Sequence, residues 1–127
     1  MLAKKILIID DDRMIRLTTG MLLAKHNVQV LYASNGNEGV AMAKIEKPEL
    51  ILLDIMMPGM DGWQVLDEIR SDPQIAHIPV AIFTAGDYIA AEVKAKERNI
   101  RRIIRKPFRL NDFLKNCEIP ERENNHE

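Results

Sequence analysis

The chain of 127 residues is poor in cysteine, in aromatic side chains and in long apolar runs. Its single cysteine, Cys117, cannot form an internal disulfide and fits a reducing compartment. The longest run without a charged side chain, Pro73 to Gly86, has 14 residues and falls short of the ~20 that a membrane-spanning helix needs. Near the N-terminus only four apolar residues, Ile6 to Ile9, precede three aspartates, too few for the core of a signal peptide. We therefore expect a cytoplasmic chain with no membrane partner.

The chain also lacks an excess of charge of either sign. Eighteen Lys and Arg residues stand against 19 Asp and Glu residues, which gives a formal net charge of -1. No field of the whole molecule draws the chain to nucleic acid or to an anionic membrane, so we expect no direct nucleic-acid partner. The hydrophobic share of 46% and the length fit one globular domain. We assign this domain to residues 1–118 and expect the polar residues 119–127 to form a flexible tail.

Five short apolar runs have the length of β-strands. The first, third and fourth are almost continuously apolar, as central parallel strands covered on both faces are, whereas Val28 to Tyr32 alternates and predicts an edge strand. The five runs are residues 6–9, 28–32, 50–53, 80–83 and the weaker 100–104. Segments of helical length follow them, at residues 13–25, 37–47, 62–71, 88–98 and 110–117.

This alternation of strands and helices predicts an α/β fold of the flavodoxin-like, doubly wound kind. We expect a five-stranded parallel sheet of order 2-1-3-4-5 with five helices on its two faces. Ligands of such sheets bind outside the carboxyl ends of the strands. Functional residues are therefore expected where each apolar run stops.

Polar side chains stand at four of these ends. The first run is followed by Asp10, Asp11 and Asp12, the third by Asp54, the fourth by Thr84 and the fifth by Lys106. Each has an ordinary structural explanation when it is taken alone: Asp12 could cap a helix, and Lys106 could be a solvated surface charge. Because all of these polar residues are expected at the carboxyl ends of the strands, on one edge of the sheet, together they predict a functional site.

The acidic residues of this rim predict a divalent cation. Carboxylates packed together repel one another, and a hard cation relieves that repulsion. Mg²⁺ suits Asp11 and Asp54, with Asp10 behind them, because this ion commonly uses one or two carboxylates and a phosphate oxygen. The histidines and the cysteine are scattered along the chain, which argues against zinc.

The same rim carries the groups that phosphoryl transfer needs. Asp54 can act as the nucleophile, while a cation and Lys106 balance the charge that spreads over the phosphoryl oxygens. Thr84 can donate a hydrogen bond to one of these oxygens. The set therefore favours transfer of a phosphoryl group to an aspartate.

Four motifs, in order along the chain, resemble those of the receiver domains of two-component response regulators: Lys5 to Asp12, Leu52 to Gly62, Phe83 to Ala85 and Arg105 to Phe108. The resemblance covers residues 4 to 117. It implies that Asp54 is the phosphoacceptor, and that Asp10, Asp11 and the backbone carbonyl of Met56 hold the metal together with Asp54. It also implies that Thr84 carries the switch hydroxyl and that Lys106 is the invariant lysine of the family.

The resemblance also implies the partners of the chain. The phosphoryl donor is expected to be a histidine kinase or a histidine phosphotransfer protein, and the output a downstream protein effector. A receiver catalyses only its own phosphorylation and dephosphorylation, so we expect a signalling module rather than a metabolic enzyme.

The chain departs from the family pattern on its output side. Ile103 stands three residues before Lys106, where the family usually has an aromatic residue that changes rotamer on activation. A β-branched aliphatic side chain has few rotamers, so aromatic switching is not expected. We predict instead that the signal appears as displacement of the loop from Thr84 to Tyr88 and of the fourth helix.

Two groups of residues near the predicted site have more than one explanation. Residues 94–109 carry eight basic side chains against one acidic side chain, Glu97, which fits either a solvated surface or a dock for an acidic partner. Met56, Met57 and Met60 surround the predicted acceptor loop, and Trp63 follows them. Core packing or an ordinary surface contact explains these side chains as readily as a partner site does.

Two other functions stay open on the same fold. A phosphatase of the haloacid dehalogenase type would use Asp10 as nucleophile and Asp12 as acid, although Met14 stands where that family needs threonine or valine. Flavin binding would need a glycine-rich or hydroxyl-rich phosphate loop after the first strand, where three aspartates stand instead. The site of the acyl phosphate, Asp54 or Asp10, distinguishes a receiver from the phosphatase.

Overall fold

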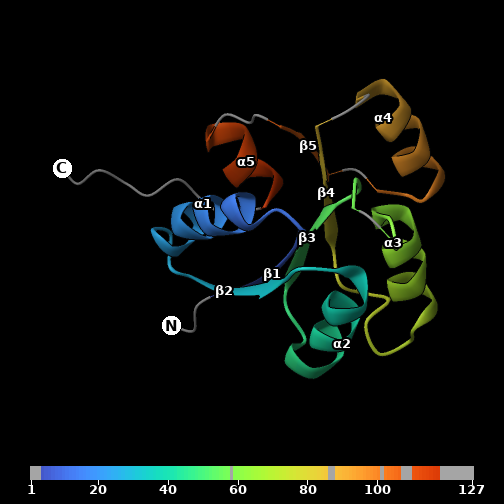
Figure 1. Cartoon of the computed structure of the whole chain (residues 1–127), viewed down its shortest axis with the longest axis horizontal. Helices are drawn as coiled ribbons and strands as arrows, with labels where there is room; N and C mark the ends of the chain where they lie inside the picture. Colours follow the sequence, from blue (N-terminus) through green and yellow to red (C-terminus); the bar gives the residue numbers. More distant parts are fainter. Residues whose placement is uncertain (1–3, 58, 86–87, 101, 107–109, 118–127) are drawn as a thin grey trace.

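A computed structural model of the chain describes residues 4–57, 59–85, 88–100, 102–106 and 110–117. One sheet lies between two layers of helices (Figure 1). Its strands are β1 (Lys4–Ile9), β2 (Val28–Ala33), β3 (Leu50–Asp54), β4 (Val80–Thr84) and β5 (Arg102–Arg105). The helices are α1 (Arg13–Ala24), α2 (Gly36–Glu46), α3 (Gly62–Ser71), α4 (Tyr88–Glu97) and α5 (Leu110–Asn116).

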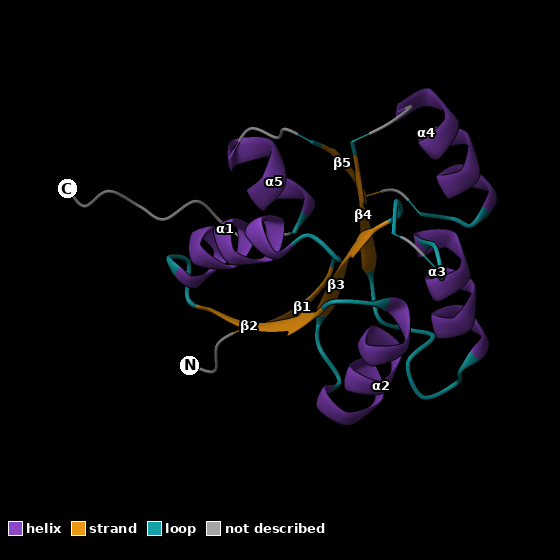
Figure 2. Cartoon of the chain, viewed as in Figure 1, coloured by secondary structure: helices purple, strands orange, loops and turns teal. Residues whose placement is uncertain are grey.

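The sheet has the order β2-β1-β3-β4-β5, and all of its strands are parallel. The predicted fold class and strand order are therefore confirmed, and β2 is an edge strand as its alternating pattern indicated. Helices α1 and α5 cover one face of the sheet, and α2, α3 and α4 cover the other (Figure 2). In the described part of the chain, no helix is both long enough and apolar enough to cross a membrane.

The central strands are continuously apolar because each face of the sheet has its own core. In β1, Leu7 and Ile9 belong to the core under α2, α3 and α4, whereas Ile6 and Ile8 belong to the core under α1 and α5. Successive side chains of a strand point to opposite faces, so both sets must be apolar. On the face covered by α1 and α5, the ring of Phe83 stacks on the ring of Phe113 in α5, with the ring centroids 6.0 Å apart.

The strands β3 and β4 each run one residue beyond their apolar stretch. Asp54 ends β3 and Thr84 ends β4, so both polar residues are fixed by the ladder of the sheet. The helices agree with the predicted segments to within one residue at each end, and α3 agrees at both ends. The predicted tail, residues 119–127, lies outside the described residues.

The fifth strand was predicted two residues too early. It begins at Arg102, and Ile100 closes the end of α4 instead of pairing with β4, because its N–H donates to the carbonyl of Ala95 at 2.8 Å. Asn99, just before it, has a φ of 58° in the left-handed region, which ends the helical path. An apolar run alone does not distinguish a strand from the buried end of a helical turn.

Candidate functional site

The structure brings three of the predicted acidic residues together at the carboxyl ends of β1 and β3. Asp10 directly follows β1, where its N–H donates to the carbonyl of Ala33 at 3.1 Å, and its side chain is fully buried. Asp54 at the end of β3 is also buried, whereas Asp11 is exposed. Oxygen atoms of the three carboxylates lie within 4.8 Å of one another. We call Asp10, Asp11 and Asp54 the acid pocket.

Lys106 brings a positive charge into the acid pocket. Its Nζ lies 3.0 Å from Asp10 Oδ2 and 3.6 Å from Asp54 Oδ1, and only 14% of its side chain is exposed. The backbone fixes this position, because Lys106 follows β5 and its N–H donates to the carbonyl of Thr84 at 2.8 Å. One ammonium group therefore faces two buried carboxylates.

The environment of Asp54 raises its pKa from the usual 3.8 to about 6. Burial is the largest cause, because it penalises the charged form, and the nearby charge of Asp10 adds to it. The N–H of Met56, which donates to Asp54 Oδ1 at 3.1 Å, and the charge of Lys106 act in the opposite direction. Asp54 therefore changes its charge closer to neutral pH than an ordinary aspartate does.

Thr84 lies beside this pocket on the neighbouring strand. Asp54 is paired with Phe83 in the β3–β4 ladder, so Thr84 is one residue beyond the level of Asp54. Its side chain is 1% exposed, and its partner in the β4–β5 ladder is Arg105. Thr84 is thus fixed by the sheet at the same carboxyl edge as Asp54.

Asp12 has a different role from the other two aspartates that follow β1. Its Oδ1 accepts hydrogen bonds from the N–H groups of Met14 and Ile15 at 2.8 and 3.2 Å, so it caps helix α1. Its own N–H donates to Asp10 Oδ1 at 2.9 Å. The side chain is exposed, and Asp12 is not part of the acid pocket. The helix cap considered for this residue is therefore confirmed.

The donor set of the acid pocket fits a hard divalent cation. Three carboxylates offer oxygen ligands, and the group contains no histidine or cysteine. The family resemblance implies the backbone carbonyl of Met56, two residues after Asp54, as a further ligand, and the Met56 side chain is 66% exposed. Met57, by contrast, is buried in the core, so the methionines of this loop have separate roles.

Several basic side chains near the site have specific partners rather than forming a uniform charged surface. Arg105 lies over the ring of Tyr88, with its guanidinium carbon 4.4 Å from the ring centroid. Arg98 lies 5.1 Å from the centroid of Trp63 and also forms an ion pair of 3.0 Å with Asp67. Sequence reasoning missed these contacts, because no local pattern connects residues that meet across two elements.

A groove opens next to the acid pocket, between the loop after β3 and helix α4. It has a volume of about 460 Å³. Its lining residues are Ile55, Met56, Met57, Asp61, Trp63 and Lys94. Trp63 is half-buried, and Lys94 Nζ lies 6.0 Å from its ring centroid, so this tryptophan packs against its own domain.

The doubly wound parallel sheet and the carboxylates at its carboxyl rim define a flavodoxin-like α/β domain with a candidate cation site. Residues 6–118 match the family described as response regulator receiver domain. Protein PilH of Pseudomonas aeruginosa is 41% identical over 113 residues, which cover 87% of this chain and 92% of PilH. The response regulator PleD of Caulobacter vibrioides is 36% identical over 108 residues, which cover 84% of this chain but 24% of PleD.

Solved structures agree with this match. The chemotaxis protein CheY4 of Vibrio cholerae superimposes with a TM-score of 0.84 at 25% identity, over 91% of this chain and 97% of its own. The N-terminal domain of a response regulator receiver protein from Methanoculleus marisnigri gives a TM-score of 0.75 at 32% identity, over 90% of this chain and 93% of its own. The chain therefore belongs to the family of response regulator receiver domains.

Membership in this family gives the chain a general role. It is a receiver domain of two-component signalling, and its acid pocket fits the phosphoryl-accepting role of such domains. The family implies a metal ion, a histidine kinase as partner and an effector, and it is not a family of classical enzymes. Neither these matches nor the position of Asp12 supports the dehalogenase-type phosphatase.

Proposed function

We propose that Asp54 accepts the phosphoryl group from a histidine kinase or a histidine phosphotransfer protein, and that Asp10, Asp11, Asp54 and the carbonyl of Met56 hold Mg²⁺ for this reaction. The observation that carries the proposal is the position of Asp54. It ends a central strand, is buried, and lies beside a second buried carboxylate, Asp10, with the ammonium of Lys106 facing both. No other carboxylate of the acid pocket combines these features with a place on the strand next to Thr84.

The proposed step is an in-line displacement at phosphorus. A carboxylate oxygen of Asp54 forms the new P–O bond while the bond from phosphorus to the donor nitrogen breaks, and the nitrogen of the donor imidazole keeps that electron pair. When bound, Mg²⁺ supplies charge balance for the phosphoryl oxygens. Lys106, which faces Asp54 at 3.6 Å, neutralises further charge on these oxygens, and Thr84 donates a hydrogen bond to one of them.

Phosphorylation is proposed to act on the surface around α4 and β5. A hydrogen bond from a hydroxyl to a charged group gains ~1.5–3 kcal/mol, enough to shift a two-state loop about tenfold or more. Thr84 leads directly to the loop before α4, and its ladder partner Arg105 contacts Tyr88 at the start of that helix. We place this exchange in the cytoplasm, with residues 1–118 as the receiver and 119–127 as its tail.

Incubation with acetyl phosphate and Mg²⁺ tests the proposal. The wild-type chain is expected to gain one phosphoryl group by intact mass, whereas EDTA and the Asp54→Asn variant are expected to abolish the gain. Asp67→Asn is a matched control, because Asp67 is an exposed carboxylate on α3 outside the acid pocket. Undiminished labelling of Asp54→Asn overturns the assignment.

A further inference from the structure

Helix α4 is held to the domain by smaller buried side chains than its neighbour α3. The buried residues of α4 are Ala91 and Ala95, whereas α3 buries a valine, a leucine and an isoleucine. The larger aliphatic side chains of α4, Ile89 and Val93, are 71% and 54% exposed. Burial of apolar surface is the main force that holds a helix on a sheet, and elements that bury little of it move most readily. Contacts at the two ends of α4 are therefore important for its position.

Four side chains join the C-terminal end of α4 to α3. Trp63 and Asp67 lie about one helical turn apart on α3, and Lys94 and Arg98 have the same spacing at the end of α4. The guanidinium carbon of Arg98 lies 5.1 Å from the centroid of the Trp63 ring, and Lys94 Nζ lies 6.0 Å from it. Arg98 Nε also donates to Asp67 Oδ1 at 3.0 Å. We call these four residues the latch.

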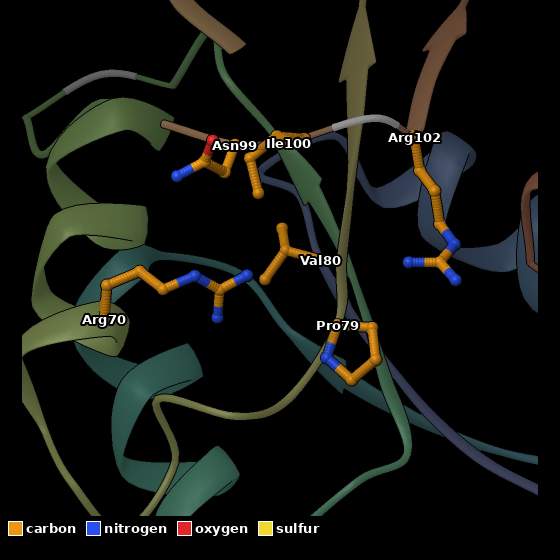
Figure 3. A pocket seen from close by; sticks show the side chains of 6 residues that line it. All are labelled: Arg70, Pro79, Val80, Asn99, Ile100 and Arg102. Carbon is orange, nitrogen blue, oxygen red and sulfur yellow. The ribbon is translucent and has the colours of Figure 1, made fainter. Parts of the chain in front are cut away.

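Open space lies on both sides of the latch. Towards the acid pocket is the groove of about 460 Å³, whose lining includes Trp63 and Lys94 of the latch itself. Beyond the latch, a second pocket of about 360 Å³ lies between Arg70 of α3 and the two residues Asn99 and Ile100 that follow α4 (Figure 3). The latch thus joins the two helices at one level, between two hollows.

The N-terminal end of α4 is connected to a different part of the domain. Its first residue, Tyr88, lies under the guanidinium of Arg105, at 4.4 Å from the ring centroid. Arg105 belongs to β5 and is the ladder partner of Thr84, the hydroxyl residue of the proposed switch. One end of α4 therefore contacts the strand next to the switch, and the other end contacts α3.

We infer that α4 pivots about its C-terminal end when the domain is phosphorylated: the end at Tyr88 moves, while the latch keeps the end at Arg98 beside α3. The inference rests on the proposed function, because phosphorylation of Asp54 is the cause of the motion. A bound group moves an element only through interactions that differ between its two positions. The latch contains no residue of the acid pocket, so a phosphoryl group does not act on its contacts directly.

Distances between pairs of spin labels in the full chain test the inference. One label is attached at Met21→Cys, an exposed position of α1 on the opposite face of the sheet, and the second at Ile89→Cys or at Lys96→Cys. Native Cys117 is buried, and burial raises its pKa to about 12, so the reagent attaches to the introduced cysteines. With Mg²⁺ and beryllofluoride, a mimic of the phosphoryl group, we expect the label at position 89 to move by ~2 Å or more and the label at position 96 to move less than half as far.

A variant of the latch connects the pivot to its cause. Arg98→Gln removes the ion pair with Asp67 and the cation beside the Trp63 ring, so the label at position 96 is expected to move as far as the label at position 89. Lys115→Gln is the control, because it removes a positive charge from an exposed position of α5. It is expected to behave like the wild type.

Fluorine resonance of the bound beryllofluoride separates the inference from the proposed function. With this signal present, equal displacement of both labels in the wild type overturns the pivot. An unmoved label at position 96 in Arg98→Gln, or its release by Lys115→Gln, overturns the role of the latch. A missing signal in the wild type instead contradicts the proposed function, on which the inference rests.

Discussion

Lys106 and Asp10 are 96 residues apart in the chain, yet they form an ion pair of 3.0 Å in the acid pocket. The same ammonium lies 3.6 Å from Asp54, so a single lysine balances part of the charge of two buried carboxylates. A divalent cation supplies positive charge to the same carboxylates and therefore competes with this ion pair. In the proposed function, the lysine is then available to contact a phosphoryl group on Asp54.

Replacing Lys106 with Met separates these two roles. The variant is expected to bind Mg²⁺ at least as tightly as the wild type, because a competing ammonium is gone, whereas phosphorylation by acetyl phosphate is expected to slow ~10-fold or more. Fluorescence or calorimetric titration measures the metal affinity, and intact mass over time measures the phosphorylation rate. Loss of metal affinity with a normal rate of phosphorylation contradicts the proposed role of Lys106.

The raised pKa of Asp54 predicts how stability depends on pH in the absence of metal. Between about pH 4 and 6 the folded chain binds more protons at Asp54 than the unfolded chain, because the pKa is about 6 in the fold and 3.8 otherwise. Charged Asp54 therefore destabilises the fold above pH 6, and this destabilisation disappears as the pH falls towards 4. We expect Asp54→Asn to raise the free energy of unfolding by ~1–3 kcal/mol at pH 7 and to leave it almost unchanged at pH 4.

Urea unfolding in EDTA at both pH values measures this difference. Mg²⁺ is expected to stabilise the wild type at pH 7 and to stabilise Asp54→Asn much less, because the variant lacks one proposed ligand. A variant that is no more stable than the wild type at pH 7 shows that burial does not penalise the charge of Asp54.

The contact between Tyr88 and Arg105 predicts how phosphorylation in the acid pocket changes the structure of α4. Arg105 is the ladder partner of Thr84, and its guanidinium lies over the Tyr88 ring at the start of α4. Beryllofluoride serves as a mimic of the phosphoryl group. We expect its addition to change the hydrogen exchange of amides from Thr84 through Arg105 in the wild type. In Tyr88→Leu the changes in α4 are expected to shrink at least ~2-fold, since a cation–π contact of ~0.5–1 kcal/mol is lost.

Tyr88→Phe keeps the ring and is the matched control for this experiment. It is expected to behave like the wild type, and both variants are expected to accept a phosphoryl group. Equal changes in α4 in Tyr88→Leu show that the contact does not transmit the signal. Changes confined to the acid pocket of the wild type show that phosphorylation does not switch α4.

The close approach of α3 to the backbone of Asp54 and Ile55 predicts a strict need for glycine at position 62. A Cβ atom at Gly62 would lie 2.6 Å from the carbonyl oxygen of Asp54 and closer still to the Cα of Ile55. Backbone cannot yield as a flexible side chain can, so Gly62→Ala is expected to lower the free energy of unfolding by ~1–3 kcal/mol and to slow phosphorylation.

Gly59→Asn is the control for the glycine variant. Gly59 has a φ of 81°, which asparagine tolerates better than most residues, and its Cβ position is open. This variant is expected to lower the free energy of unfolding by less than ~1 kcal/mol. Denaturant unfolding measures both variants, and an equal cost shows that the approach of α3 is not the reason for glycine at position 62.

Much of the site was predictable because it follows from strand ends. The apolar runs before Asp54 and Thr84 predict central parallel strands, and carboxyl ends of neighbouring parallel strands necessarily lie side by side. The sheet order then brings Asp10 next to Asp54. These steps need only the two-residue period of a strand and the direction of the chain.

Other features depend on where individual side chains point, which no local pattern encodes. Ile100 has the apolar character of a strand residue, but its N–H donates a hydrogen bond that closes the end of α4. The predicted strand therefore started at Ile100, two residues before the observed start of β5 at Arg102. The sequence of the basic stretch from residue 94 does not show that Arg98 pairs with Asp67 or that Arg105 lies over Tyr88. Such contacts join elements that are far apart in sequence, so they appear only when the fold is assembled.

The most direct test of the central claim is to locate the acyl phosphate. The chain is phosphorylated with acetyl phosphate and Mg²⁺ and then treated with borohydride, which reduces an aspartyl phosphate to homoserine, and peptide mass spectrometry finds the modified position. A receiver predicts homoserine at position 54 and unmodified aspartate at position 10. Homoserine at position 10 with an intact Asp54 contradicts the account, because it shows that the nucleophile is at the end of β1.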